Sequence, residues 1–539
     1  LQTSTWYKSD MQKKIALRLS PAAADDPETV KAAIAAAENL LPDDISGFYP
    51  LKRSIDARSR NIYINLTVMA SIGEAFTPRQ LDPLRSKNVH HASQQALIIG
   101  AGPAGLFAAL ELLELGIKPI IIERGKDVRE RRRDLAALNK EGIVNPDSNY
   151  CFGEGGAGTY SDGKLYTRSS KRGDIDKVLN LLVQFGADDR IIYESHPHIG
   201  TNKLPQIITA IREHIIHCGG EVMFNERLTD MDIRDGLVHS VLTSTGKRIK
   251  ADTFILATGH SARDIFQLLH QKNILVESKP FALGVRVEHP QALIDSIQYK
   301  CSTRDSHLPP SSYSLVQQVE GKGVFSFCMC PGGIIAPAST TQGALVVNGW
   351  SPSKRNNPYA NSGMVVEVTA KDILQSATQK FFPSLKTIPD NPLLLMAFQN
   401  LVEEKAYTAG GGKFVAPAQR LEDFTRNKFS SALPDCSYVP GLASTQLSDV
   451  LPPFIHKRLQ EGFRHFGKQM RGYLTNDAVV VATESRTSSP VRIPRNELLQ
   501  HPQLENLYPC GEGAGYAGGI VSAAMDGQKI ARAIAHLYK

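Results

Sequence analysis

Long apolar runs are missing from the sequence, which excludes a typical membrane-spanning helix. The most apolar stretch, residues 96–125, is interrupted by glycines and carries Glu111 and Glu114. A secretory signal is also missing, because the first residues have no apolar centre. The seven cysteines are scattered and odd in number, which suits a reducing compartment better than a disulfide framework. We therefore expect a cytoplasmic protein with no membrane contact.

Strong charge of one sign is absent as well. The formal net charge is +7 over 539 residues, which permits contact with an anionic ligand or RNA but does not require it. Apolar residues make up 42% and charged residues 21% of the chain, as in an ordinary globular protein. A chain of this length can bury a large core, and we expect more than one domain.

Residues 96–125, ALIIGAGPAGLFAALELLELGIKPIIIERG, organise the rest of the chain. The apolar residues at its start predict a buried strand, which is followed by the G-x-G-x-x-G spacing of Gly100, Gly102 and Gly105. The first glycine permits a tight turn, the second lets the backbone approach a pyrophosphate, and the third lets a helix pack closely on its strand. Residues 106–115 predict that helix, whose free N–H groups and dipole favour phosphates.

A second strand is expected over residues 119–122, and it presents Glu123 at its tip. This is close to the spacing of an acid that accepts ribose hydroxyls. A glycine triplet alone is common in turns. The order of strand, triplet, helix, strand and acid is specific, and it predicts an adenine dinucleotide site.

Residues 11–70 predict a small separate module with the order strand, helix, strand, strand. A binding surface for RNA or a partner and a solvated charged face both explain its basic composition. We favour the charged face because aromatic platforms for RNA are missing. The basic residues are Lys13, Lys14, Arg18, Lys52, Arg53, Arg58 and Arg60.

Two unusual segments follow the nucleotide unit. Residues 124–135, RGKDVRERRRDL, form a dense basic run, which we interpret as an exposed helix rather than a support for cofactor phosphates. Residues 149–165, NYCFGEGGAGTYSDGKL, are too rich in glycine for an ordinary linker. Their backbone amides, with Ser161 and Lys164, could wrap a flavin ribityl chain or a diphosphate.

A helix is expected over residues 202–217 and a further parallel strand over 219–228, followed by a β-meander near 228–250. The meander leads into a buried strand that ends at Thr258 and Gly259. This succession is typical of the glutathione-reductase type of flavoprotein fold.

Residues 506–535 contain the last informative motif. A short strand runs into Gly511 and Glu512, where a carboxylate can accept hydrogen bonds from ribityl hydroxyls. A helix rich in small residues then begins at Ile520, directly after Gly518 and Gly519. Its N-terminal dipole could stabilise negative charge at the flavin N1 and C2 carbonyl.

These motifs resemble those of a family of bacterial and plastid-type FAD-dependent dehydrogenases whose substrates are largely unassigned. The matching segments are GAGPAGLFAAL, IIERG, GEGGAGTYSDGKL, ATGHSARD, FALGVRVEHP, SFCMCPGG, ESRTSSPVRIP and CGEGAGYAGGIVSAAMDG. The resemblance covers nearly all of residues 93–539 and extends to the N-terminal module. It implies FAD as cofactor, and it implies no substrate.

Together, the motifs and the resemblance assign FAD binding to residues spread over the whole nucleotide unit. They are Gly100, Gly102, Pro103, Ala104, Gly105, Glu123, Arg124, Gly155, Gly156, Ser161, Lys164, Arg227, Leu228, Thr258, Gly259, Gly511, Glu512, Gly518, Gly519 and Ile520.

The expected fold class is α/β, with a Rossmann-like FAD-binding domain of the glutathione-reductase type. We expect a small α+β module with a linker over residues 1–92 and the FAD-binding domain over 93–280 and 476–539. A β-rich α+β cap domain is expected as an insertion over 281–475. No second G-x-G-x-x-G with strand, helix and acid appears, which argues against a dedicated nicotinamide domain. NAD(P)H, if it is the reductant, would bind transiently through the cap.

The pair Cys328 and Cys330 has two interpretations. On an extended strand these residues share a face with Cα atoms about 6.6–6.8 Å apart, at the upper edge of disulfide reach. A redox dithiol and two buried small residues of a core strand both fit, and we place the core strand slightly ahead. The pair is a poor zinc site because two further ligands at the usual spacing are missing.

Several polar residues are expected to reach the pocket and are the catalytic candidates together with the two cysteines. They are His260, Arg263, Arg286 and Arg486, with Glu484 and Arg492 nearby. Arginines at this density could clamp a carboxylate or a phosphate of a substrate, although each alone is more often part of an interface salt bridge.

The leading hypothesis is an FAD-dependent oxidoreductase that passes a hydride between flavin N5 and a small-molecule substrate, which the arginines suggest is anionic. The second hypothesis is an RNA-modifying flavoprotein that grips RNA through the N-terminal module. The third is a flavin redox sensor with little turnover.

Overall fold

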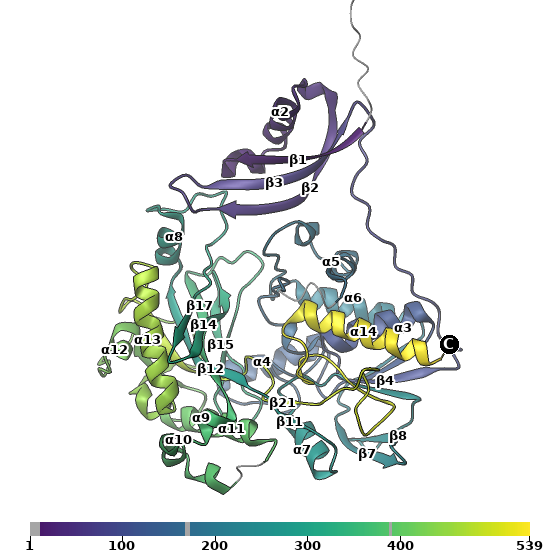
Figure 1. The fold of residues 1–539 in the computed structure, drawn as a ribbon, viewed down its shortest axis with the longest axis vertical. Coiled ribbons are helices and arrows are strands. Elements are labelled where there is room, and N and C mark those ends of the chain that lie inside the picture. Colours follow the sequence, from purple (N-terminus) through teal and green to yellow (C-terminus); the bar gives the residue numbers. More distant parts are fainter. Residues whose placement is uncertain (1–10, 168–172, 388–390, 539) are drawn as a thin grey trace, which may run out of the picture.

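The computed structural model describes residues 11–167, 173–387 and 391–538. They form three parts, which are an N-terminal module (11–72), a parallel-sheet domain (93–278 and 491–538) and an inserted domain (279–490) (Figure 1). Residues 1–10, on which the expectation about a secretory signal rests, lie outside the described part of the chain.

The N-terminal module is a three-stranded antiparallel sheet with the order β1-β3-β2 and two helices on it, which confirms the expected order of elements. Asp26 caps the longer helix by accepting from the Thr29 N–H, and Val30 and Ile34 of this helix are buried in the core of the module. Tyr299 and Leu308 of the inserted domain complete this core. The elements are β1 (Met11–Leu19), α1 (Pro21–Asp25), α2 (Pro27–Glu38), β2 (Ile45–Asp56) and β3 (Tyr63–Ile72).

The parallel-sheet domain is built on five strands in the order β22-β10-β4-β5-β6, all of them parallel. Its central strand β4 is buried from Ala96 to Ile99, as expected for a strand with helices on both faces. Because the chain runs outward from β4 on one side and later fills the other side at β10, the order reverses between these two strands. In such sheets ligands bind at that point, beyond the carboxyl ends of the strands. The strands are β4 (Gln95–Ile99), β5 (Lys118–Ile122), β6 (Glu221–Met223), β10 (Thr253–Leu256) and β22 (Leu507–Pro509).

Helices and a small meander surround this sheet. The meander joins three antiparallel strands, as predicted. The helices α3 and α14 lie side by side across the sheet (Figure 1). The elements are α3 (Pro103–Leu115), α4 (Val128–Glu141), α5 (Ile175–Gln184), α6 (Leu204–His217), β7 (Leu228–Arg234), β8 (Leu237–Thr243), β9 (Arg248–Ile249), α7 (Arg263–Gln271) and α14 (Ile520–Leu537).

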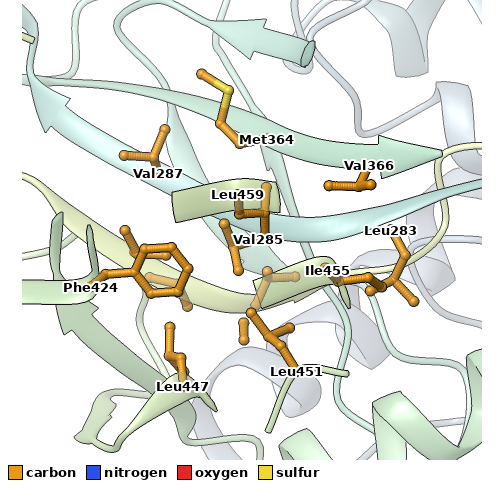
Figure 2. Packing of buried hydrophobic residues seen from close by; sticks show 14 of the residues in the cluster. Leu283, Val285, Val287, Met364, Val366, Phe424, Leu447, Leu451, Ile455 and Leu459 are labelled. Atoms are coloured by element: carbon orange, nitrogen blue, oxygen red, sulfur yellow. The ribbon is translucent and has the colours of Figure 1, made fainter. Parts of the chain in front are cut away.

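The inserted domain is organised around a seven-stranded sheet with the order β13-β14-β17-β12-β20-β18-β19. Its centre is β12 (Phe281–Pro290), whose apolar residues Leu283, Val285 and Val287 are fully buried. Figure 2 shows them in one cluster with Ile455 and Leu459 of α13 (Pro453–Gln469). The other strands are β13 (Val316–Val319), β14 (Lys322–Cys330), β17 (Tyr359–Val368), β18 (Ala416–Arg420), β19 (Leu442–Ser444) and β20 (Val479–Glu484).

One detail of this domain differs from expectation. The sheet includes β20, so it continues past the expected boundary at residue 475. After β17 the chain forms two short helices rather than one, because Leu374 ends the first and Gln375 leaves the helical conformation. The helices are α8 (Gln291–Tyr299), α9 (Ala370–Ile373), α10 (Ser376–Phe381), α11 (Leu394–Ala409) and α12 (Leu421–Thr425), and a separate ribbon joins β15 (Ile334–Pro337) to β16 (Val347–Trp350).

The chain leaves and re-enters the parallel-sheet domain at one place. Strand β11 (Glu277–Ser278) pairs antiparallel with β21 (Val491–Arg492), and the Lys279 N–H donates to the Pro490 carbonyl oxygen at 3.0 Å. Among the described residues, no helix is long and apolar enough to cross a membrane.

Candidate functional site

A large open cavity lies beyond the carboxyl ends of β4 and β10, at the point where the strand order reverses. One wall comes from the parallel-sheet domain and consists largely of glycine-rich backbone. The opposite wall comes from the inserted domain and its exit segment, and it consists of Phe327, Cys328, Asn348, Arg486 and Thr487. The cavity therefore joins two domains of different construction.

The N-terminus of α3 forms the first part of the backbone wall. Gly102 is its N-cap, and Gly102, Pro103 and Ala104 line the cavity. Gly105 does not line it, because this residue faces the strand, where a Cβ would lie 2.0 Å from the Gly100 carbonyl oxygen. The glycine spacing thus gives close helix–strand packing and leaves the helix N-terminus open to an anionic group.

Glu123 lines the cavity, but its carboxylate is largely committed to the protein backbone. Oε2 accepts from the Ala101 N–H at 2.9 Å, and Oε1 accepts from the N–H groups of Gly125 and Gly153, both at 2.9 Å. A carboxylate has about four acceptor sites, so three are in use. Besides any contact with a ribose, this side chain joins the loop after β4, the loop after β5 and the glycine-rich segment 149–165.

The glycine-rich segment 149–165 folds against this wall, with Gly156, Ser161 and Lys164 on the cavity. Arg131 of α4 holds it in place. This fully buried side chain donates to the carbonyl oxygens of Asn149, Glu154 and Gly156 at 2.8, 2.8 and 2.9 Å. The basic run was expected to be an exposed helix, and Arg131 departs from that expectation because the loop offers it three buried acceptors.

The N-terminus of α14 forms the other part of the backbone wall. Gly519 is its N-cap with a φ of +90°, and a side chain there would point into open space. A Cβ at Gly527 would lie 2.1 Å from the Ala104 carbonyl oxygen, so the small residues of α14 also allow its close crossing with α3. Two helix N-termini therefore face the same cavity.

Glu512 and His260 lie close together on this wall, with Nδ1 of His260 3.7 Å from Oε1 of Glu512. Burial raises the pKa of Glu512 to about 7, and burial together with the charge of Arg486 lowers the pKa of His260 to about 4. His260 is therefore neutral at neutral pH, and the contact is not an ion pair. Lys279, which the sequence analysis did not single out, is a positive neighbour of Glu512.

Two arginines expected to face a substrate are instead bound to one buried glutamate. Arg263 donates to both carboxylate oxygens of Glu403 at 2.9 and 2.8 Å, and Arg486 donates to them at 3.3 and 3.1 Å. Arg486 still lines the cavity, whereas Arg263 does not. Because Arg263 belongs to the parallel-sheet domain and Glu403 to the inserted domain, this cluster is an interface salt bridge.

Arg286 is fully buried and does not reach the cavity, against expectation. Its guanidinium donates to Glu484, to Asn361 and Asn348, and to the carbonyl oxygen of Cys328 at 2.7 Å. Arg286 lies on β12, the central strand of the sheet, and its charge is therefore used by neighbouring protein groups and not by a ligand. Arg492, also expected in the pocket, pairs with Glu277 at the chain crossing.

Cys328 lines the cavity and Cys330 is buried behind it. Nζ of Lys164 lies 3.8 Å from each of the two sulfur atoms. Lys164 belongs to the glycine-rich wall and the two cysteines to the inserted domain, so this contact joins the two walls.

The structure divides the predicted cofactor residues into two groups. Those that line the cavity are Gly100, Gly102, Pro103, Ala104, Glu123, Arg124, Gly156, Ser161, Lys164, Arg227, Leu228, Thr258, Gly259, Glu512, Gly519 and Ile520. Those that support its walls without lining it are Gly105, Gly155, Gly511 and Gly518.

Two positioning residues, Arg131 and Glu403, are not among those predicted from the sequence. Glu403 stands among the buried residues of α11, and a glutamate on an apolar helix face is the signal that could have indicated a buried partner. Arg131 carried no comparable signal, because it is one of four arginines within five residues.

Comparison with known sequences finds three family models. They are a domain of unknown function over residues 11–71, an FAD binding domain over 93–137 and the C-terminal domain of FAD-dependent proteins over 280–487. An uncharacterized protein of Clostridium beijerinckii is 39% identical over 529 residues, which are 95% of this chain and 96% of that protein. The chain belongs to this family of FAD-dependent proteins. It is a flavoprotein of an oxidoreductase-type family with a mixed α/β FAD-binding fold, and its cofactor is FAD.

Solved structures give a more remote likeness. A structure of CtdE in complex with FAD is similar over 82% of this chain and 84% of that chain, with a TM-score of 0.33 and 11% identity. A geranylgeranyl bacteriochlorophyll reductase-like protein from Thermoplasma acidophilum is similar over 83% and 79% of the two chains, with a TM-score of 0.35 and 12% identity.

Proposed function

We propose that the protein is an FAD-dependent oxidoreductase that transfers a hydride between flavin N5 and a small molecule bound between the two domains. The observation that carries this proposal is the shared cavity, which has a glycine-rich wall with two helix N-termini on one side and side chains of the inserted domain on the other. The residues fit FAD, because Gly259 and Gly519 line the cavity with backbone that has nothing within 4 Å of an added Cβ.

The residues of each wall have distinct tasks in this proposal. The N-terminus of α3 would bind the pyrophosphate, and the N-terminus of α14 would stabilise negative charge on the ring. Glu512 would bind ribityl hydroxyls, as its position at the end of β22 suggests. The bound FAD supplies the capacity to accept and donate electrons, and the chain supplies orientation and electrostatics.

We propose further that the FAD-binding domain is of the glutathione-reductase type and that the inserted domain is a cap over the flavin. The support is the order of the elements around the parallel sheet and the meander between β6 and β10. Among the described residues, a second parallel sheet for a dinucleotide is missing. NAD(P)H as a transient reductant would therefore enter the same cavity.

Two further expectations have less support from side-chain contacts. The anionic substrate was inferred from arginines, and Arg263 and Arg486 already share Glu403. The RNA-binding alternative relied on free cations in the N-terminal module, and four of these are paired with carboxylates. They are Lys13 with Glu38, Arg18 with Asp56, Arg53 with Asp25 and Arg58 with Asp56.

The test is to purify the protein, measure its FAD content, and mix it anaerobically with NADH and then NADPH while following the visible flavin absorbance. We expect stoichiometric FAD and bleaching by one of the two nucleotides. Bleaching by neither, with FAD bound, would leave a dehydrogenase reduced by its own substrate and would overturn the role of NAD(P)H.

A matched pair of variants locates the cofactor. Gly102→Asp places a carboxylate at the α3 N-cap, and we expect it to abolish FAD binding by repelling the pyrophosphate. Gly246→Asp makes the same change in an open meander turn and should retain FAD. Equal FAD content in the two variants would contradict the assigned site.

A further inference from the structure

The segment Phe327–Cys330 departs from regular strand geometry where it meets the cavity. The pairing of β14 with β17 is regular up to Phe327 and shifts register before Cys330. Cys328 has a φ of +48°, in the left-handed region that non-glycine residues rarely adopt. Such irregularities in a strand re-aim side chains, and here they place Cys328 on the cavity and Cys330 behind it.

We propose that Cys328 and Cys330 are a redox-active dithiol that exchanges two electrons with the bound FAD. The proposal deepens the proposed function, since it rests on the same cavity and names a reaction of its inserted-domain wall. In the oxidising direction the Cys328 thiolate and the Cys330 thiol join in one S–S bond, which releases two electrons and the proton of Cys330. FAD takes up both electrons and a proton, and the reverse step restores the thiolate and the thiol.

The two sulfur atoms lie beside the same cation, each 3.8 Å from Nζ of Lys164. A regular strand would hold their Cα atoms at the upper edge of disulfide reach, and the register shift removes that constraint. The Cys330 thiol is hydrogen-bonded to the Cys328 sulfur, and it also lies 3.2 Å from the Cys328 carbonyl oxygen. None of the seven cysteines forms a disulfide in this structure, so the pair is in its reduced form.

The surrounding charges distinguish the two thiols. Lys164 lies 3.8 Å from both sulfur atoms, and it also donates to the Met329 carbonyl oxygen between them. Arg286 approaches from below, with Nη2 4.0 Å from the Cys330 sulfur. The negative groups that face the pair are Glu484, bound to Arg286, with Asp162 and Glu512.

The result is one thiolate and one thiol. The hydrogen bond from Cys330, with the charges of Lys164 and Arg286, holds the pKa of Cys328 well below its usual range. The same hydrogen bond and burial raise the pKa of Cys330. A low-pKa thiolate on the cavity and a protonated partner behind it are the asymmetry that dithiol exchange requires. Two ordinary core cysteines need no cation between them, and in the described residues no group of three potential ligands offers a metal site instead.

The first test measures alkylation of Cys328 by iodoacetamide as a function of pH, read by peptide mass spectrometry in the full chain. We expect its rate to level off at a lower pH than that of a free thiol, because the low pKa of Cys328 makes the thiolate form earlier. N-acetylcysteine in the same samples is the control, and its rate should rise about tenfold per pH unit below its thiol pKa. Lys164→Met should move the plateau of Cys328 towards that of the control, and Lys164→Arg should preserve it.

The second test follows the pair itself. In FAD-loaded protein under air we expect a peptide with a Cys328–Cys330 disulfide, lighter by two hydrogens than the reduced form. Cys330→Ser should abolish it, and Cys301→Ser should leave it intact. A Cys328 rate that levels off at the same pH as that of the free thiol, or the absence of the disulfide, overturns the proposal. In that case, flavin bleaching by NAD(P)H in the Cys328→Ser protein would show that the proposed oxidoreductase function does not depend on the dithiol.

Discussion

Glu403 at the domain interface and Glu484 behind the cavity wall are both buried and both bound to arginine. Their pKa values nevertheless shift in opposite directions. Burial raises the pKa of either carboxyl group, but two arginines flank Glu403 and lower its pKa to about 2. Glu484 has only Arg286, with the Cys328 thiolate as a negative neighbour, and its pKa rises to about 7. The number of cations around a buried carboxylate therefore decides whether it is a fixed charge or a titrating group.

The largest effect is expected at the interface. Glu403→Ala leaves Arg263 and Arg486 without their counter-charge, and breaking a buried pair in this way costs about 3–5 kcal/mol of the free energy of unfolding. Urea unfolding followed by circular dichroism measures it. Glu404→Ala, an exposed neighbour on the same helix, should stay within about 0.5 kcal/mol of the parent chain. Equal losses in the two variants would show that the cluster does not hold the domains.

Acid should weaken the Glu403 cluster. Because the folded-state pKa lies below the unfolded value, the folded state binds fewer protons, and the stabilisation is lost as the pH falls from about 4.5 towards 2. The stability difference between the parent chain and Glu403→Gln should shrink over this window by up to about 3 kcal/mol. Urea midpoints at successive pH values give the difference. A constant difference would mean that the carboxylate is not the charged member of the cluster.

Glu484 should show the opposite slope. Its folded-state pKa lies above the unfolded value, so the folded state binds more protons, and stability falls as the pH rises from about 4.5 to 7. The parent chain should therefore lose stability relative to Glu484→Gln over this range, again by up to about 3 kcal/mol. Unfolding at pH 5 and pH 8 measures the change. A slope of the same sign for both glutamates would remove the contrast between the two clusters.

The smallest expected effect is the difference in stability between a serine hydrogen bond to a charged acceptor and one to a neutral acceptor. The Ser485 hydroxyl donates to the Glu403 carboxylate at 2.6 Å, and the Ser489 hydroxyl donates to the Val491 carbonyl oxygen at 2.6 Å. Both serines are buried. Ser485→Ala should cost about 1.5–3 kcal/mol and Ser489→Ala about 0.5–1.5 kcal/mol in urea unfolding. A larger loss at Ser489 would argue that Glu403 depends on its arginines alone.

The backbone wall of the cavity could be predicted from the sequence because its information is local. Glycine spacing, an apolar strand and a helix of small residues fix their own geometry within 10–20 residues, and residues such as Gly102 and Gly519 line the cavity. The strand–helix order of the N-terminal module followed from local periodicity in the same way.

The opposite wall could not be predicted, because its contacts join distant segments. Lys164, Arg286, Cys328 and Glu484 come from three strands and a loop, and only the sheet order brings them together. Sequence pattern also cannot tell an arginine that faces a ligand from one that faces a buried glutamate. Arg263 and Arg286 were misplaced for that reason, and Arg131 was overlooked in a run of similar residues.

The antiparallel pairing of β11 with β21 has a consequence for how this chain could have been assembled. Glu277 and Arg492 are direct partners, so the departure and return of the inserted domain lie next to each other like the two ends of a hairpin loop. To the parallel sheet, the whole inserted domain is topologically one long loop. Such a unit can be gained, lost or exchanged in a single genetic step without rearranging its host. The same cofactor site could in this way be fitted with different chemistry by replacing the wall that faces it.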